Sequence, residues 1–293
     1  MKHSVLLLFS LVLLAGCSRA ASQSPVVGNV SRDTILGVPC CVYLPNDYPA
    51  RSHNERFPVL YLLHGMYGSE DDWTVQGNLL HWMDSLLTAQ SVGEMVVVMP
   101  DNFLGSIPPD ERQALMASPD ITPDGESFST SSGSAHWRKL TSEQERAYEM
   151  SGYWETHFPL FMAETEKRYS IAREPSGRAI AGLSMGGFHT MHISHYMPAT
   201  FAYIGLFSPA VIPADSIEPY IDWQNQVIRM MDAHPLYWIA IGREDHLFDF
   251  VQNYRSWLED NHLEYTYYQS AGGHTWPNWQ DYLVRFLTLT DWK

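Results

Sequence analysis

The stretch Gly182-Leu183-Ser184-Met185-Gly186-Gly187 decides the fold predicted for this chain. It has the form G-x-S-x-G, with the apolar run Ala179-Ile180-Ala181 before it and a helix-compatible run, 188–196, after it. A strand, a sharp turn and a helix in this order expose a serine hydroxyl at the end of a sheet, in strained backbone that needs small neighbours. The motif alone is weak, because a glycine-rich turn can contain a serine by chance. Ser184 is therefore a candidate nucleophile that needs further support.

A second glycine-bearing loop, His64-Gly65-Met66-Tyr67-Gly68, follows the continuous apolar run 57–63. Such a run is typical of a strand buried on both faces in a mostly parallel sheet. A loop at the carboxyl end of a central strand is where such a sheet places ligand-contacting backbone. Beside a serine nucleophile, this loop supplies one oxyanion-binding amide and the residue after the serine supplies the other, which here means Met66 and Met185. The alternative is a plain turn after a strand.

Strand-like and helix-like runs alternate along the chain. Strands are expected at 33–44, 57–63, 95–99, 179–181, 201–207, 236–241 and 264–268, and helices at 79–87, 153–169, 188–196, 251–258 and 279–286. This order predicts an α/β fold with a mostly parallel central sheet and helices on both faces. One domain spanning 33–293 accommodates all of it. The pattern is lost at 102–152, which we expect to be an inserted loop region over the site that shapes the pocket.

The three residue types of a nucleophilic triad occur in a meaningful order. A serine needs a base within hydrogen-bond reach and an acid that orients the base. Ser184, Asp245 and His274 follow one another in the order serine, acid, histidine, each just after a predicted strand. Glu244 is the rival acid, and we prefer Asp245. His246 is the rival base, but it lacks the flanking glycines that would let its loop approach the serine.

No metal or cofactor is predicted. His189, His192 and His195 repeat every third residue on a predicted helix. Zinc sites on helices more often use pairs four residues apart with a further ligand. Cys40 and Cys41 are neighbours on a predicted strand, so they should face opposite sides, and a disulfide between them would be strained. Small buried side chains are their expected role.

The N-terminus has the pattern of an export signal. Lys2 precedes the apolar run 5–15, which is too short to span a bilayer permanently and is typical of a signal-peptide core. Leu14-Ala15-Gly16-Cys17 resembles the lipobox of bacterial lipoproteins, which implies a signal peptide at 1–17, a lipid anchor on Cys17 and a location at the cell envelope. A polar tether, 18–32, would follow. Cleavage at Ala20-Ala21 is the alternative and would give a freely secreted or periplasmic protein.

The formal net charge of −15 argues against nucleic acid or an anionic membrane surface as a partner. Contact with a membrane is thus expected only through the N-terminal lipid. The sequence does not indicate an oligomeric state.

Together these motifs resemble the esterase D-like branch of the α/β-hydrolases, which includes feruloyl esterases, acetylxylan esterases, enterochelin esterases, S-formylglutathione hydrolases and mycolyltransferases. The resemblance rests on Val42-Tyr43-Leu44-Pro45, Leu62-Leu63-His64-Gly65, Asp72-Trp73, Met99-Pro100-Asp101, the run 178–187, Gly242 with Asp245, and Gly273-His274. It implies a serine carboxylesterase with Ser184, Asp245 and His274 as its triad.

The resemblance also suggests a substrate. A small-molecule or oligosaccharide ester, such as an acetyl or feruloyl ester on plant-type polysaccharide, is expected. Four aromatic residues flank the proposed catalytic loops and are candidates to stack on a sugar or an aromatic acyl group: Tyr67, Trp73, Trp276 and Trp279. Acyl transfer to a sugar acceptor remains open, and a non-catalytic lipoprotein that binds glycan or a siderophore on this scaffold is the rival from another class.

Overall fold

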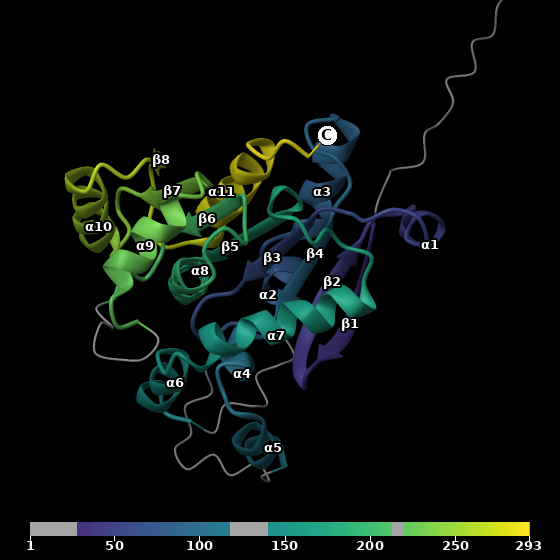
Figure 1. Cartoon of the computed structure of the whole chain (residues 1–293), viewed down its shortest axis with the longest axis horizontal. Coiled ribbons are helices and arrows are strands. Elements are labelled where there is room, and N and C mark those ends of the chain that lie inside the picture. Colours follow the sequence, from purple (N-terminus) through teal and green to yellow (C-terminus); the bar gives the residue numbers. More distant parts are fainter. Residues whose placement is uncertain (1–27, 118–139, 213–219, 293) are drawn as a thin grey trace, which may run out of the picture.

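A mixed sheet of eight strands forms the centre of the structure, which is a computed structural model (Figure 1). It describes residues 28–117, 140–212 and 220–292, so the predicted signal peptide with Cys17 and most of the tether lie outside the described residues. The strand order is β1-β2-β4-β3-β5-β6-β7-β8. The strands are β1 (Asn29–Ile35), β2 (Val38–Leu44), β3 (Val59–Leu63), β4 (Val96–Pro100), β5 (Arg178–Leu183), β6 (Tyr203–Phe207), β7 (Leu236–Gly242) and β8 (Thr266–Ser270).

The first two strands correct the prediction of one strand at 33–44. They form an antiparallel hairpin in which Ile35 pairs with Val38 across Leu36 and Gly37. Both loop residues have positive φ, 51° and 77°, as a two-residue turn matched to strand twist requires. The domain also begins earlier than residue 33, because β1 starts at Asn29. Strand β2 pairs antiparallel with β4, and all later neighbours in the sheet pair in parallel.

Helices cover both faces of this sheet (Figure 1). They are α1 (Tyr48–Arg51), α2 (Asp72–Val75), α3 (Leu79–Thr88), α4 (Asn102–Gly105), α5 (Pro109–Ala117), α6 (Ser142–Glu149), α7 (Tyr153–Arg168), the short 3-10 turn η2 (Pro175–Gly177), α8 (Met185–Tyr196), α9 (Trp223–Met231), α10 (Phe248–Asp260) and α11 (Trp276–Thr288). The five predicted helices correspond to α3, α7, α8, α10 and α11. Outside 102–152, α1, α2 and α9 were not predicted.

The segment 102–152 is more regular than the sequence suggested. It contains α4, α5 and α6, while residues 118–139 lie outside the described residues. The Asp101 carboxylate accepts a hydrogen bond from the Leu104 amide and caps α4. Thr141 and Gln144 form a reciprocal capping box at the start of α6. Caps of this kind allow short helices between prolines, where apolar periodicity is weak.

Alternating side chains of the central strands fill two separate cores. Val59, Tyr61 and Leu63 of β3 lie in the core shared with α7, α8, α9 and α10. Leu60 and Leu62 lie in the opposite core with α3 and α11. The predicted burial of this strand on both faces is confirmed. The parallel pairing from β4 through β8 places the carboxyl ends of these strands along one edge of the sheet.

Cys40 and Cys41 point into these two different cores, and both are free buried thiols, as predicted. Burial raises the pKa of the Cys41 thiol to about 12, so this side chain is protonated and unreactive at neutral pH. Among the described residues, no helix has the length and apolar character needed to cross a bilayer.

Candidate active site

Ser184 occupies the sharp turn between β5 and α8. Its backbone has φ 54° and ψ −115°, a conformation that side-chain-bearing residues rarely adopt. The neighbouring strand β6 and the loop after it hold this geometry, because the Ser184 amide donates to the Phe207 carbonyl at 3.0 Å and its carbonyl accepts from the Ala210 amide at 2.9 Å. The side chain is half-buried. This strained strand–turn–helix is the arrangement predicted from the G-x-S-x-G pattern.

Two glycines let the turn close. A Cβ at Gly186 would lie 2.7 Å from the Leu63 carbonyl oxygen, and one at Gly182 would lie 2.8 Å from Thr190 Oγ1 while also meeting the Gly186 carbonyl. These contacts involve backbone, which cannot rotate away. The requirement for small neighbours on both sides of Ser184 is thus a matter of space.

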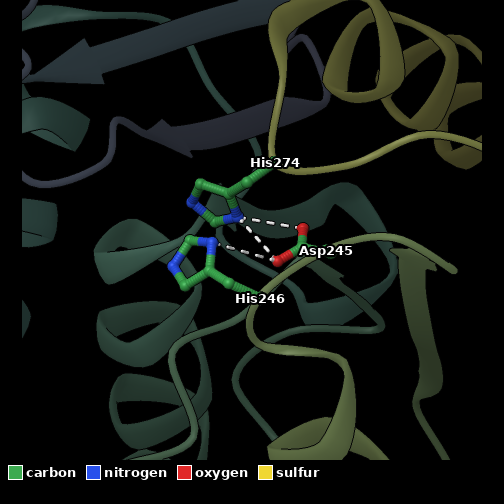
Figure 2. Close-up of side chains that lie close together, drawn as sticks. All are labelled: Asp245, His246 and His274. Carbon is green, nitrogen blue, oxygen red and sulfur yellow. Dashed lines mark hydrogen bonds and ion pairs between the residues drawn. The ribbon is translucent and has the colours of Figure 1, made fainter.

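Asp245 and His274 meet beyond the ends of β7 and β8 (Figure 2). The His274 Nδ1 atom lies 2.9 Å from Asp245 Oδ2 and 3.1 Å from Oδ1. The Asp245 side chain is fully buried, whereas the His274 side chain is 19% exposed. Asp245, and not its exposed neighbour Glu244, is therefore the acid that contacts this histidine.

Backbone pairing continues past the strands and brings these two loops together. The Arg243 amide donates to the Ser270 carbonyl at 3.0 Å, and the Glu244 amide donates to the Gly272 carbonyl at 3.1 Å. The loop carrying Asp245 is thereby fastened to the loop carrying His274. Their contact is built into the backbone and does not depend on side-chain packing alone.

The surroundings of Asp245 favour its ionised form. Burial by itself raises the pKa of a carboxyl group, but the hydrogen bond from His274, the Leu247 amide at 2.9 Å from Oδ1 and the electrostatic interaction with His274 outweigh it. The pKa of Asp245 consequently lies below its usual value. An ionised carboxylate at this place fixes the proton of His274 on Nδ1 and leaves Nε2 as the proton acceptor.

Ser184 and His274, both described residues, share no direct hydrogen bond in this structure. Catalytic hydrogen bonds are often long without substrate and tighten in the complex.

The predicted oxyanion loop lies directly beside the elbow. A Cβ at Gly65 would be 3.3 Å from Ser184 Cβ, which shows how closely the two loops approach. Within the described part of the chain, neither the Met66 amide nor the Met185 amide donates a hydrogen bond to another protein group. Two unpaired backbone donors next to a serine hydroxyl are what an oxyanion site requires.

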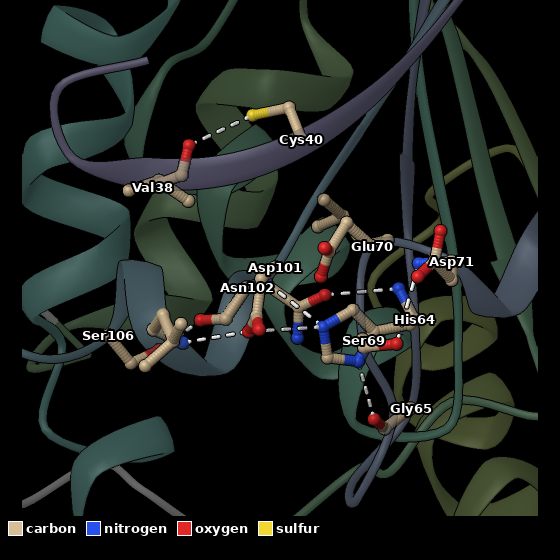
Figure 3. Close-up of polar contacts among 12 residues, drawn as sticks. Val38, Cys40, His64, Gly65, Ser69, Glu70, Asp71, Asp101, Asn102 and Ser106 are labelled. Carbon is tan, nitrogen blue, oxygen red and sulfur yellow. Dashed lines mark hydrogen bonds and ion pairs between the residues drawn. The ribbon is translucent and has the colours of Figure 1, made fainter. Parts of the chain in front are cut away.

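His64 anchors the predicted oxyanion loop through hydrogen bonds to Asn102, a structural role that the sequence analysis missed (Figure 3). Its ring and backbone form a reciprocal pair with Asn102, because the His64 amide donates to Asn102 Oδ1 at 3.0 Å and the Asn102 amide donates to His64 Nε2 at 3.1 Å. The remaining ring nitrogen, Nδ1, lies 2.7 Å from the Gly65 carbonyl oxygen and donates to it. Both side chains are buried. The only sequence signal for this pairing was the position of both residues just after predicted strands.

The four aromatic residues proposed to bind substrate separate into two groups. Trp73 is 1% and Trp279 is 7% exposed, and both belong to the core, so neither presents a free face to a ligand. Trp279 instead packs edge-on against His274, with ring centres 4.8 Å apart, and thereby supports the histidine. Trp276 is half-buried between the two tryptophans, and Tyr67 is 44% exposed. Tyr67 and Trp276 remain the candidates for substrate contact.

The three histidines of α8 do not converge on a common point. His189 Nδ1 pairs with Glu155 Oε1 at 2.7 Å, and His195 Nε2 lies 3.3 Å from the Tyr237 hydroxyl. Burial lowers the pKa of His195 to about 3, so its ring is neutral. These side chains are polar parts of the core behind the elbow.

The helices of 102–152 also form a surface hollow of about 430 Å³, lined by α5, the end of α6 and the start of α7. The Tyr148 hydroxyl donates to Glu111 Oε2 at 2.7 Å at this place. None of the predicted triad residues lines it. A role of this segment in shaping the substrate pocket stays a prediction.

A mostly parallel sheet with an elbow serine and an acid–histidine pair at the carboxyl edge of its parallel strands defines an α/β-hydrolase. Comparison with known proteins narrows this class. A family model described as "Putative esterase" matches residues 37–103 and 109–289. The chain belongs to this esterase family, and it is an enzyme of the serine esterase class, a carboxylic ester hydrolase.

One curated relative is an endo-1,4-beta-xylanase/feruloyl esterase from Xylanibacter ruminicola, which is 28% identical over 184 residues. The match covers 60% of this chain and 20% of the relative, so the chain spans about a fifth of the length of the curated relative it matches.

Solved structures share the fold. A ferulic acid esterase superposes with a TM-score of 0.63 at 22% identity, covering 90% of this chain and 98% of its own. A CE1 ferulic acid esterase from Anaeromyces mucronatus, solved with ferulic acid, gives 0.64 at 20% identity, with 90% and 91% covered. An S-formylglutathione hydrolase from Staphylococcus aureus gives 0.61 at 15% identity, with 90% and 95% covered. The predicted α/β-hydrolase fold is confirmed.

Proposed function

We propose that the protein is an exported serine carboxylesterase that cleaves acyl esters through a covalent acyl-enzyme on Ser184. The observation that carries this proposal is the buried Asp245 carboxylate in contact with Nδ1 of a partly exposed His274. An acid that is shielded from water and a base that is open to substrate are what activation of a serine hydroxyl needs. The elbow geometry of Ser184 and the two unpaired amides support the same assignment.

In the proposed mechanism, the Ser184 oxygen attacks the ester carbonyl carbon while His274 Nε2 takes the hydroxyl proton. Asp245 holds the other ring proton on Nδ1 and stabilises the imidazolium that forms. The amides of Met66 and Met185 donate to the oxyanion, and removing one such donor typically costs about 100- to 1000-fold in turnover. His274 then returns the proton to the leaving alcohol. Water, activated by the same histidine, hydrolyses the acyl-enzyme.

For the substrate we propose acetyl or feruloyl esters on plant-type polysaccharide or oligosaccharide. The support is analogy: the curated relative is named a feruloyl esterase in part, and two of the solved structures above are ferulic acid esterases. We propose Tyr67 and Trp276 as the aromatic side chains that stack on a sugar or on an aromatic acyl group.

The test uses the chain from residue 18 onward with 4-nitrophenyl acetate and methyl ferulate, beside Ser184→Ala. We expect turnover of at least one ester and its loss in the variant. Turnover of neither ester, or turnover that Ser184→Ala leaves unchanged, would refute the proposal. Cleavage of the acetate alone would favour deacetylation over the cleavage of feruloyl esters.

Export and lipidation at Cys17 are proposed from the sequence pattern alone. Globomycin, which blocks lipoprotein signal peptidase, should make the unprocessed precursor accumulate in a bacterial host. Processing that is insensitive to globomycin and unaffected by Cys17→Ala would favour free secretion.

A further inference from the structure

His246 is an imidazole at the catalytic centre to which the proposed mechanism gives no role. Its side chain is 69% exposed, while its Nδ1 atom lies 3.7 Å from Asp245 Oδ1, too far for a hydrogen bond. Its ring is tilted edge-on to the His274 ring, with centres 4.5 Å apart. Figure 2 shows both rings with nitrogen atoms turned toward the same carboxylate.

The three side chains together offer a compact set of metal ligands. One ligand atom from each of Asp245, His246 and His274 lies within 4.8 Å of the others. Two imidazoles and one carboxylate form a donor set that binds Zn²⁺ in proteins, with a fourth position open to solvent. Imidazole nitrogens favour zinc and neighbouring transition metals over Mg²⁺ and Ca²⁺, which prefer all-oxygen sites.

The distances between these ligand atoms fit a bound Zn²⁺ after small side-chain movements. Zinc-to-nitrogen bonds of about 2.0–2.1 Å in a tetrahedron place neighbouring ligand atoms about 3.3–3.4 Å apart. The two distances to one carboxylate oxygen, Asp245 Oδ1, bracket this value, at 3.1 Å from His274 Nδ1 and 3.7 Å from His246 Nδ1. The paired loops after β7 and β8 hold Asp245 and His274 in place, so His246, on the open side, is the ligand that must adjust.

We propose that Asp245, His246 and His274 form an inhibitory site for Zn²⁺. This inference rests on the proposed function, since two of the ligands are the proposed acid and base. Zinc bonded to His274 Nδ1 replaces the proton through which this nitrogen donates a hydrogen bond to Asp245, and the one proton of the neutral ring then lies on Nε2. That nitrogen has no lone pair left with which to take the Ser184 proton, so the esterase stops until the metal leaves.

The first experiment titrates ZnCl₂ into esterase assays of the wild type, His246→Gln and a matched surface control, His53→Gln, each scaled to its own metal-free rate. Losing an outer partner of a metal site costs about 10- to 100-fold in affinity, and losing a ligand should cost at least as much. We expect His246→Gln to need at least about 10-fold more zinc for half-inhibition. We expect His53→Gln to match the wild type, chelator to restore activity, and Mg²⁺ to have no effect. Equal zinc sensitivity of the wild type and His246→Gln would overturn the proposal.

The second experiment measures zinc binding by calorimetry and needs no activity. Ser184→Ala should bind one Zn²⁺, Ser184→Ala with His246→Gln should bind it at least about 10-fold more weakly, and Ser184→Ala with His246→Cys should recover binding because a thiolate is also a zinc ligand. Tight binding that His246→Gln leaves unchanged, or no binding at all, would overturn the metal site. Binding that follows this pattern, together with no turnover of either ester by the wild type, would uphold the metal site and refute the proposed function.

Discussion

The carboxylate of Asp245 is fully buried, yet the His274 ring that it contacts at 2.9 Å remains 19% exposed. The difference in exposure suits the two residues to different roles. Asp245 is shielded from water and holds one tautomer of the His274 ring. The exposed edge of His274 can take a proton from a reacting serine and give it to a leaving alcohol. The backbone pairing between the two loops fixes the relationship.

Replacing the acid should damage catalysis far more than stability. Asp245→Asn keeps the shape but can donate to Nδ1, which favours the wrong tautomer, and we expect kcat to fall about 10⁴-fold. Glu244→Gln, which alters the exposed neighbouring acid, is the matched control and should change kcat by less than about twofold, as surface substitutions usually do. Steady-state kinetics with 4-nitrophenyl acetate would decide, and equal losses in the two variants would contradict the choice of Asp245.

The lowered pKa of Asp245 predicts a pH dependence of stability. The folded-state pKa lies below that of the unfolded chain, about 3.9, so folding favours the ionised carboxylate. Its contribution should be complete above about pH 5 and should be lost as the pH falls through the folded-state value. Urea unfolding of the wild type and Asp245→Asn would measure this difference. A difference in unfolding free energy that stays constant down to pH 3 would be inconsistent with this assignment.

Asn102 should control the oxyanion loop without touching substrate. Asn102→Ala leaves the buried His64 amide without its acceptor, a cost of about 1–3 kcal/mol in unfolding free energy. Because a displacement of about 1 Å at a reacting centre can cost 10²-fold, we expect kcat to fall about 10- to 100-fold. Asn54→Ala, at an exposed position, serves as the control. A variant with full kcat would show that His64 and Asn102 do not position the loop.

Replacing the exposed Tyr67 should change KM, whereas replacing the buried Trp73 should change the free energy of unfolding. Tyr67→Ala should raise KM and leave kcat within about twofold, the signature of lost uniform binding, with Tyr196→Ala as an exposed control. Trp73→Ala should instead lower the unfolding free energy by about 3–5 kcal/mol, since it empties a core position. Kinetics and chemical denaturation of all three variants test this separation. An unchanged KM in Tyr67→Ala would remove that residue from the substrate site.

The sequence predicted those parts of the molecule where local pattern and tertiary burial agree. The runs that became β3, β5 and β7 are apolar because both faces of the sheet are covered, so their ends, and with them Ser184 and Asp245, were located correctly. The contact between Asp245 and His274 followed from chain order and strand ends.

Other features depend on packing that a sequence does not display. Leu36 gave no sign of a turn, because a leucine with positive φ is unusual, and the hairpin was read as one strand. The burial of Trp73 and Trp279 depends on which helix covers them. The pairing of His64 with Asn102 joins residues 38 positions apart, and neither carries a motif that would predict it.

The most direct test of the central claim is the mass of the protein captured during turnover of 4-nitrophenyl acetate by rapid acid quench. The account predicts a protein heavier by one acetyl group, with the modification located by peptide mapping at Ser184 and absent from Ser184→Ala. Acetylation at another residue in a form that turns over, or full turnover by Ser184→Ala, would contradict it.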